Sequence, residues 1–224
     1  SIDKQISLAN LGADFGVVGN EAVNSDSKGR SYGMEFLYQQ KMKNGYYGLI
    51  SYTYVNSAFE NEKSELVASS WDSKHILSAS AGKRFKKGWE LGLRFTYSGG
   101  APYTPIDIQT STTPGLWEIN TSGYLDYPNI NTLRAQNFHQ LDIRVDKKFN
   151  FKKWSLNIYL DIQNAYNFKA KIAPYLYVNT DDAGNPIVDP DTGRYSFELI
   201  ENVSGGILPT IGLIFEFPFS KKLN

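Results

Sequence analysis

The sequence predicts an all-β fold, a transmembrane antiparallel β-barrel of which this chain supplies only part of the wall. Three observations predict it: seven segments alternate apolar and polar residues, the segments are long, and the connections between them are alternately short and long. Alternation with a period of two gives a strand one apolar and one polar face. Each segment has about ten or more residues, which is the length needed to cross a bilayer as a tilted strand. Strands of soluble proteins average about five or six residues.

The alternation is strongest in four segments, residues 89–98, 140–148, 154–164 and 210–219. In the first of these, Leu91 and Leu93 alternate with Glu90 and Arg94. Three further segments have the same period with a weaker contrast, residues 31–42, 46–58 and 74–85. The pattern therefore predicts seven strands whose two faces lie in different media, lipid outside and a polar lumen inside.

The connections support the same architecture. Three are tight turns, residues 43–45, 86–88 and 150–153, and three are long loops, residues 59–73, 99–137 and 167–205. Barrels of the bacterial outer membrane have short turns on the periplasmic side and long loops outside. Aromatic residues gather beside the turns and at the far ends of the strands, as in the two interfacial belts of a membrane protein. They are Phe85, Trp89, Phe149, Phe151 and Trp154 near the turns, with Tyr97 and Phe138 at the far ends.

This topology divides the chain into three parts. Residues 1–29 are expected to be the end of an extracellular loop, residues 30–219 the seven strands, and residues 220–224 a periplasmic tail. Bacterial barrels have an even number of strands, and an open sheet would leave unpaired edges in lipid. We therefore expect strands outside this sequence to complete the barrel.

Composition excludes several classes of function. The chain has 23 basic and 23 acidic residues, which argues against binding to nucleic acid. It has no Cys, so disulfide frameworks and thiolate metal sites are excluded. Its two histidines, His75 and His139, are not accompanied by a catalytic or phosphate-binding motif. We expect neither an enzyme nor a bound cofactor.

Several short motifs resemble the C-terminal half of a TonB-dependent outer-membrane transporter. The motif LDIQNAYN at residues 160–167 is the most specific, and the Phe-rich segment that opens with PTIG at 209–212 resembles a terminal barrel strand. The others are GME at 33–35, SYTYV at 51–55, SGGAPYTP at 98–105 and LDIRV at 141–145.

This resemblance implies a barrel of about 22 strands around an N-terminal plug domain, in the outer membrane of a Gram-negative bacterium. It implies import of a scarce nutrient, of the iron chelate, cobalamin or glycan class, with energy delivered from the inner membrane by the TonB complex. The expected partners are the rest of the barrel, the plug, TonB, outer-membrane lipid and a surface-exposed substrate-binding lipoprotein. The plug and the segment that contacts TonB do not lie within this sequence.

The strand pattern places eight charged residues on the lumen side. We expect opposite charges on adjacent strands to pair across the wall and to hold the plug, with direct substrate contact as the alternative. These residues are Glu35, Glu90, Arg94, Asp142, Arg144, Asp146, Asp161 and Glu216.

The long loops carry the candidates for ligand contact. Exposed aromatic rings stack on sugar or chelate faces, although rings in a loop also pack loop against loop. The candidates are Trp71, Tyr103, Trp117, Tyr124 and Tyr127. Asp181, Asp189 and Asp191 are weaker candidates for calcium, since Asp, Asn, Gly and Pro also form tight turns.

Two other interpretations of the pattern stay open. Amphipathic strands also build a soluble β-sandwich binding module, such as a lectin, with one face in a core and the other in water. A porin without a plug would show the same strands.

Overall fold

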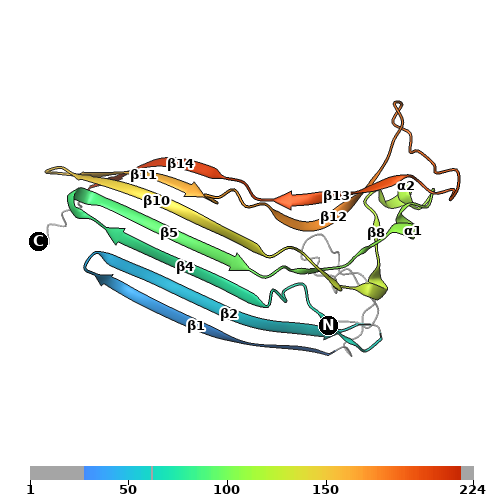
Figure 1. Cartoon of the computed structure of the whole chain (residues 1–224), viewed down its shortest axis with the longest axis horizontal. Coiled ribbons are helices and arrows are strands. Elements are labelled where there is room, and N and C mark those ends of the chain that lie inside the picture. The colour runs from blue at the N-terminus through green and yellow to red at the C-terminus, as the bar shows by residue number, and fades with distance from the viewer. Residues whose placement is uncertain (1–27, 62, 218–224) are drawn as a thin grey trace, which may run out of the picture.

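The computed structural model describes residues 28–61 and 63–217, and this part of the chain is all-β with antiparallel sheets. Seven long strands form the main sheet in the spatial order β1-β2-β4-β5-β10-β11-β14 (Figure 1). Their bounds are β1 Gly29–Lys43, β2 Tyr46–Glu60, β4 His75–Arg84, β5 Trp89–Ser98, β10 Phe138–Asn150, β11 Ser155–Gln163 and β14 Leu208–Glu216. A short strand, β3 (Leu66–Ala68), also pairs with β2.

All seven predicted strands are present, with ends that differ by a few residues from the predicted ones. The sheet is open in the described part of the chain, with β1 and β14 as its edges and no strand pairing between them. Residues 1–27 of the expected loop 1–29 lie outside the described residues, and Gly29 already belongs to β1. The tail at 220–224 and the last two residues of the predicted strand 210–219 also lie outside the described residues.

The register places like residues side by side across the whole sheet. Tyr38, Ile50, Ala79, Phe95 and Leu141 form one continuous row across five strands. The row next to it, on the opposite face, contains Gln39, Leu49, Ser80, Arg94 and Asp142, in which Leu49 is the one apolar residue. The sheet therefore has an apolar face and a polar face, and register preserves this division from β1 to β14.

Tight turns close three hairpins at one end of the sheet, which we call the turn end. At the β1–β2 turn, Asn44 and Gly45 both have positive φ angles, of 52° and 82°. An Asn-Gly pair with two positive φ values is the preferred two-residue hairpin turn. At the β4–β5 turn, Lys87 and Gly88 have φ angles of 60° and 78° within a short 3-10 turn, Lys86–Gly88.

The long connections are at the opposite end, the loop end, and they contain structure of their own. Within residues 167–205, β12 (Ala170–Val178) and β13 (Phe197–Ser204) form a second hairpin that extends beyond β11 and β14 (Figure 1). The register of this hairpin shifts between Ile172 and Tyr175, around Pro174, which cannot donate to a strand ladder. These two strands were not predicted as part of the fold.

The segment 99–137 folds into small paired pieces. Strand β6 (Pro102–Tyr103) pairs with β9 (Leu133–Arg134), and β7 (Ile106–Asp107) pairs with β8 (Tyr124–Leu125). Between them lie the four-residue helices α1 (Ile108–Ser111) and α2 (Trp117–Asn120), and a 3-10 turn at Tyr127–Asn129. No helix in the described residues has the length and apolar character needed to span a membrane.

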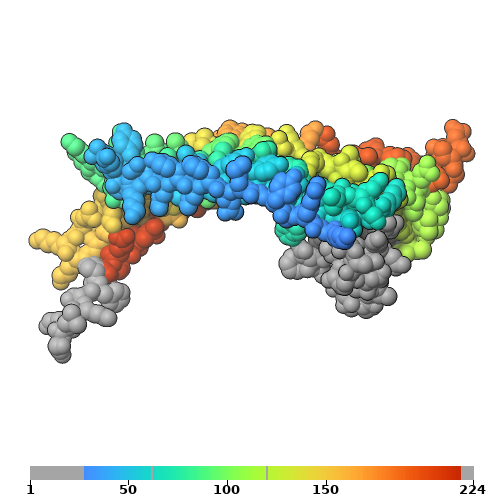
Figure 2. Space-filling view, turned by 90° about the horizontal axis from the view of Figure 1, so that it is seen from below, coloured from blue at the N-terminus to red at the C-terminus, as the bar shows by residue number. Residues whose placement is uncertain are grey.

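The apolar core is small and lies at the loop end. Among the described residues, the buried apolar side chains are Ile130, Ala170, Leu176 and Val178. None of them belongs to the main sheet. On the apolar face of the sheet Leu93 is 41 % exposed and Ile211 is 75 % exposed. Figure 2 shows the sheet from the side of β1, and no second sheet or helical layer of the described chain covers its apolar face.

Candidate functional site

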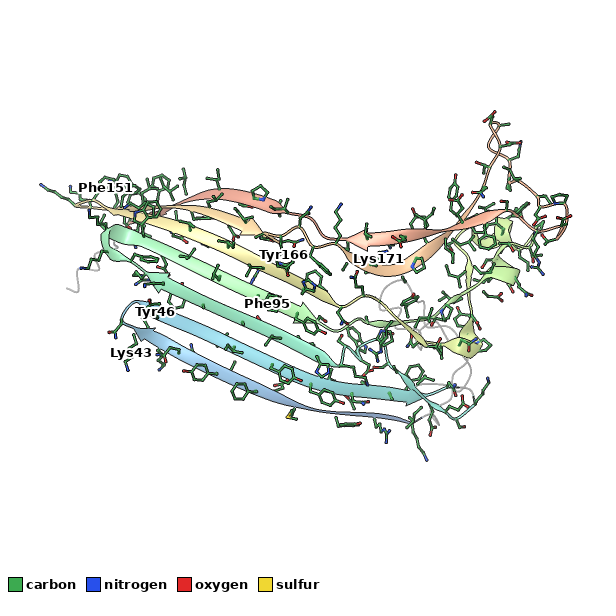
Figure 3. All side chains as sticks on the ribbon, viewed as in Figure 1. Lys43, Tyr46, Phe95, Phe151, Tyr166 and Lys171 are labelled. Carbon is green, nitrogen blue, oxygen red and sulfur yellow. The ribbon has the colours of Figure 1, made fainter. Side chains whose placement is uncertain are left out.

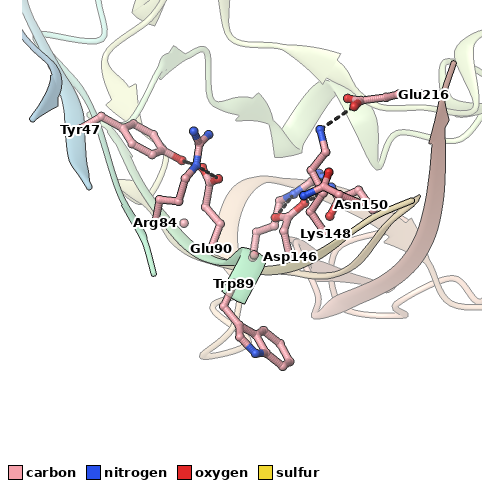
Figure 4. A pocket seen from close by; sticks show the side chains of 12 residues that line it. Tyr47, Arg84, Trp89, Glu90, Asp146, Lys148, Asn150 and Glu216 are labelled. Carbon is pink, nitrogen blue, oxygen red and sulfur yellow. Dashed lines mark hydrogen bonds and ion pairs between the residues drawn. The ribbon is translucent and has the colours of Figure 1, made fainter. Parts of the chain in front are cut away.

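The eight charged residues predicted for the lumen side all lie on the polar face of the main sheet. Their positions follow from the strand register, which pairs Asp142 with Arg94, Asp146 with Glu90, and Arg144 with Asp161. In Figure 4 the strands curve around the polar side chains, and Trp89 points away on the opposite side of the sheet. The polar face is therefore the concave one in this region.

Among these eight residues, Asp142 accepts hydrogen bonds from the largest number of other residues. Its Oδ2 accepts hydrogen bonds from Arg94 Nε and Nη2 at 2.8 and 2.7 Å. Its Oδ1 accepts from Gln140 Nε2 and from the backbone N–H of Asn164, both at 2.9 Å. This buried carboxylate thus joins β5, β10 and the end of β11.

Asn164 ends strand β11 and explains the motif at residues 160–167. It is buried with a left-handed φ of 52°, a conformation that Asn tolerates. Its side chain exchanges two hydrogen bonds with the backbone of Phe168, at 2.7 and 2.8 Å. The motif therefore forms the junction between the sheet and the β12–β13 hairpin.

A hollow of about 600 Å³ lies on the polar face at the turn end (Figure 4). Opposite charges line it in pairs. Arg144 Nε and Nη2 hold Asp146 at 2.9 Å, and Asn157 Nδ2 donates to the same carboxylate at 2.7 Å. On one side of it Glu90 accepts from Tyr47 Oη at 2.6 Å and from Arg84 Nε at 3.0 Å.

The other side of the hollow is closed by β14. Glu216 pairs with Lys148 and accepts a hydrogen bond of 2.8 Å from Ser155 Oγ. Buried Asn157 Oδ1 has no hydrogen-bond partner among the described residues. Most of the charges that line the hollow are therefore paired within the sheet.

Two tyrosines on this face lie flat over glycines of the neighbouring strand. A Cβ on Gly82 would meet the ring of Tyr47 at 2.2 Å, and a Cβ on Gly212 would meet the ring of Tyr159 at 2.2 Å. The guanidinium of Arg144 lies 3.8 Å from the centre of the Tyr159 ring. In each pair the tyrosine ring covers the glycine of the neighbouring strand, and the Tyr47 hydroxyl lies beside Glu90.

A second cluster of polar contacts organises the loop end around Asp72. This carboxylate is fully buried and accepts from the Ser57 N–H at 2.8 Å, from Lys74 Nζ at 2.9 Å and from Arg134 Nη2. Arg134 Nη1 also donates to the carbonyls of Asp72 and Gly100, at 2.6 and 3.0 Å. Burial alone would raise the pKa of Asp72, but these hydrogen bonds and the lysine charge hold the pKa below its ordinary value.

The tip of the β12–β13 hairpin contacts the helical pieces. Arg194 Nη1 donates to the Gln109 carbonyl and, at 2.8 Å, to Thr113 Oγ1. The Tyr195 hydroxyl donates to Glu118, and this hydrogen bond is the main cause of a lowered pKa at Glu118. The long loops therefore form one connected assembly at the loop end.

The five predicted loop aromatics all belong to this assembly, and their exposure differs. Trp71 is 68 % exposed, whereas the rings of the other four, Tyr103, Trp117, Tyr124 and Tyr127, are half-buried. The Tyr124 hydroxyl donates to the Leu116 carbonyl at 3.0 Å, which is a loop-packing contact. Trp71 is the member of the set that presents most of its surface to a ligand.

The three candidate calcium residues lie in tight turns, in which the carboxylates of Asp181 and Asp189 accept backbone hydrogen bonds. Asp181 Oδ1 accepts from the backbone N–H groups of Ala183 and Asn185, at 2.9 and 2.8 Å. These hydrogen bonds, the one from Asn185 first, lower the pKa of Asp181. Asp189 Oδ1 accepts from the Asp191 N–H at 2.8 Å in the same way. Within residues 28–61 and 63–217 no group of three or more His, Asp or Glu side chains has the geometry to hold a metal ion.

Both histidines lie on the apolar face near the loop end, among aromatic rings. His75 Nδ1 is 2.8 Å from the Tyr52 hydroxyl, and His139 Nδ1 is 2.7 Å from the Tyr166 hydroxyl. The Phe168 ring centre lies 3.8 Å from that of His139. Both histidines therefore take part in hydrogen bonds and ring contacts at the strand ends.

Sequence patterns missed several residues of the two clusters. Tyr47, Arg84 and Lys148 occupy the alternate strand positions that lie on the polar face, but they were not predicted as site residues. The glycine opposite Tyr47 is a signal for a covering aromatic ring. Asp72 and Arg134 are 62 residues apart, and no local pattern connects them.

The chain was compared with known proteins. No family model matches it, and no curated protein is similar enough to match it.

Proposed function

We propose that this chain is part of the barrel wall of a TonB-dependent outer-membrane transporter that imports a scarce nutrient. The nutrient belongs to the iron chelate, cobalamin or glycan class, and energy comes from the inner membrane. The proposal rests on the family resemblance of the sequence motifs and on the geometry of the main sheet.

The observation that carries the proposal is the uncovered apolar face of the seven long strands. A soluble sandwich buries such a face against a second sheet about 10 Å away. Here the described chain supplies no second layer, and Leu213 and Phe215 stay more than half exposed. Hydrocarbon is the medium that makes this surface stable.

The two unpaired edges of the sheet, β1 and β14, support the proposal that further strands complete it. An unpaired strand edge in hydrocarbon leaves N–H and C=O groups without partners, at a cost of several kcal/mol each. Strands from the rest of the protein pair with β1 and β14 and close a barrel of about 22 strands. The polar face then lines the interior, where its hollow at the turn end packs against the plug domain.

The topology is tested by cysteine labelling, because the chain has no Cys of its own. Asp191→Cys places a thiol in an exposed turn of the loop end, and Lys152→Cys places one in the β10–β11 turn. A membrane-impermeant maleimide added to intact cells should label the first variant at once. The second should react only after the outer membrane is permeabilised. Equal labelling of both in intact cells would refute the proposed orientation.

Transport is tested separately by growth under nutrient limitation. Cells that depend on this protein should grow on one of the three nutrient classes and lose that growth when TonB is deleted. Growth that persists without TonB would favour a plug-less porin.

A further inference from the structure

Cations are distributed unequally between the two faces of the main sheet. On the polar face Arg84, Arg94, Arg144 and Lys148 each form an ion pair with a carboxylate. The apolar face carries Lys43, Lys83 and Lys147 in its half nearest the turns, and no Asp or Glu of the seven strands lies on that half. None of the three ammonium groups forms an ion pair in the described chain. Two of them, Lys83 and Lys147, contact aromatic rings.

Each of these lysines is held between aromatic rings. Lys83 Nζ lies 4.3 Å from the Tyr46 ring centre and 5.1 Å from that of Phe85, and it donates to the Tyr46 hydroxyl. Lys147 Nζ lies 4.9 Å from Trp89 and 5.3 Å from Phe149. Ring faces attract ammonium groups, so the two side chains are held along the surface.

The hydrogen bonds of both ammonium groups are only partly satisfied. An ammonium has three donors. Lys83 uses one on the Tyr46 hydroxyl, and Lys147 uses one on the Lys87 carbonyl at 2.6 Å. Both acceptors are neutral. Two positively charged groups thus keep donors for an anion that the described chain does not supply.

The surroundings of the pair identify the kind of anion. Figure 3 shows Lys43 and Tyr46 together at the turn end, and Figure 4 shows Trp89 on the side away from the charged hollow. The turns add Lys86, Lys87, Lys152 and Lys153 and contain no acidic residue. Beyond the lysines toward the loop end the face is apolar, with Ala81, Leu93, Ile143 and Ile162 in one row. An occupant with a phosphate at the turn end and alkyl chains along the strands fits this surface.

We propose that Lys83 and Lys147 bind the headgroup phosphate of an anionic glycerophospholipid, of the phosphatidylglycerol class, in the leaflet on the turn side. The inference rests on the proposed function, because it requires the apolar face to lie in a bilayer. One strand, β5, lies between the strands of the two lysines, and the register offsets them by two residues. They are therefore about 10 Å apart across the sheet and about 7 Å apart along it, so both contact the same shell of lipid. Aromatic rings position the ammonium groups at headgroup depth, and Lys stems reach along apolar surface to the interface.

The experiment uses the full-length protein in nanodiscs with Trp89 as its only tryptophan, after Trp71, Trp117, Trp154 and any tryptophan outside this chain are changed to Phe. Quenching of Trp89 is measured with brominated phosphatidylglycerol and with brominated phosphatidylcholine at equal content. We expect roughly fivefold preferential quenching by phosphatidylglycerol. The double variant Lys83→Gln/Lys147→Gln should lose this preference. The matched variant Lys152→Gln/Lys153→Gln removes the same charge from the turn and should retain it.

Three results would overturn the inference, and they differ in what else they affect. Equal loss of preference in both double variants would show a diffuse charge effect in place of a site. Equal quenching by the two lipids in the unsubstituted chain would show that no anionic headgroup is selected, with the membrane location intact. No quenching by either lipid would place Trp89 outside the bilayer and would refute the proposed function as well.

Discussion

Arg94 and Asp142 lie directly opposite each other on β5 and β10, and two guanidinium nitrogens donate to one carboxylate oxygen at 2.7 and 2.8 Å. The same carboxylate accepts the backbone N–H of Asn164, a buried residue at the end of β11. The Asp142 side chain therefore links β5 to β10 in register and also binds the residue at which the chain leaves β11.

Replacement of Asp142 should destabilise the protein through the Asn164 N–H. Asp142→Ala leaves that buried donor without a partner, which costs about 2 kcal/mol, while the half-exposed Arg94 remains hydrated. Guanidinium unfolding in detergent micelles measures the loss. Asp161→Ala is the control, because Asp161 lies on the same face and has no hydrogen bond to another side chain in the described chain; its cost should be within about 0.5 kcal/mol.

The contact between Tyr47 and Gly82 predicts a position-specific penalty for alanine. Gly82→Ala drives a methyl group into the Tyr47 ring, and overpacking of this kind costs about 1–3 kcal/mol. Gly92→Ala is the matched control on the next strand, where the nearest atom to a Cβ is 3.9 Å away. Unfolding of the two variants should differ by about that amount. If a Tyr47→Ser background does not remove most of the Gly82→Ala penalty, the ring is not its cause.

Asp72 predicts a pH dependence at the loop end. Asp72→Asn should lower the local opening free energy around Ser57 and Gly100 by about 2 kcal/mol at pH 7, because hydrogen bonds to a charged acceptor are lost. Amide hydrogen exchange of the loop segments measures this change. Glu65→Gln, an exposed position in the same loop, should leave exchange unchanged.

The sign of the effect follows from the lowered pKa of Asp72. The folded-state pKa of Asp72 lies below the ordinary 3.8. The stabilisation that the charged carboxylate provides is therefore complete above that value and is lost as the pH falls through the folded-state pKa. Wild type and Asp72→Asn should therefore converge in acid. A constant difference from pH 7 to pH 2 would contradict the charged state of the carboxylate.

The strands were predictable because each carries its own local signal. Alternation in segments such as β5 fixes which residues share a face, and Asn44-Gly45 specifies a two-residue turn. The residues that pair across the polar face were harder to predict from the sequence. This is because β5 and β10 are separated by a long loop and their register is set by tertiary contacts.

The β12–β13 hairpin and the Asp72 cluster were missed for different physical reasons. In β12 the apolar residues are nearly continuous from Ala173 to Val178 and are interrupted by Pro174, so no period of two is visible. Asp72 is one acidic residue in a polar loop, and its partners come from Ser57, Lys74 and Arg134. Only folding of two separate loops brings them together.

The proposed function requires that hydrocarbon contacts the apolar face, and a pair of arginine substitutions on β5 measures whether it does. Leu93 lies near the middle of the strand on the apolar face, and Thr96 lies three residues further on the polar face. In lipid vesicles, Leu93→Arg should lower the free energy of unfolding by about 2–4 kcal/mol, whereas Thr96→Arg should have a much smaller effect. Equal costs at the two positions, or a larger cost at Thr96, would contradict the account.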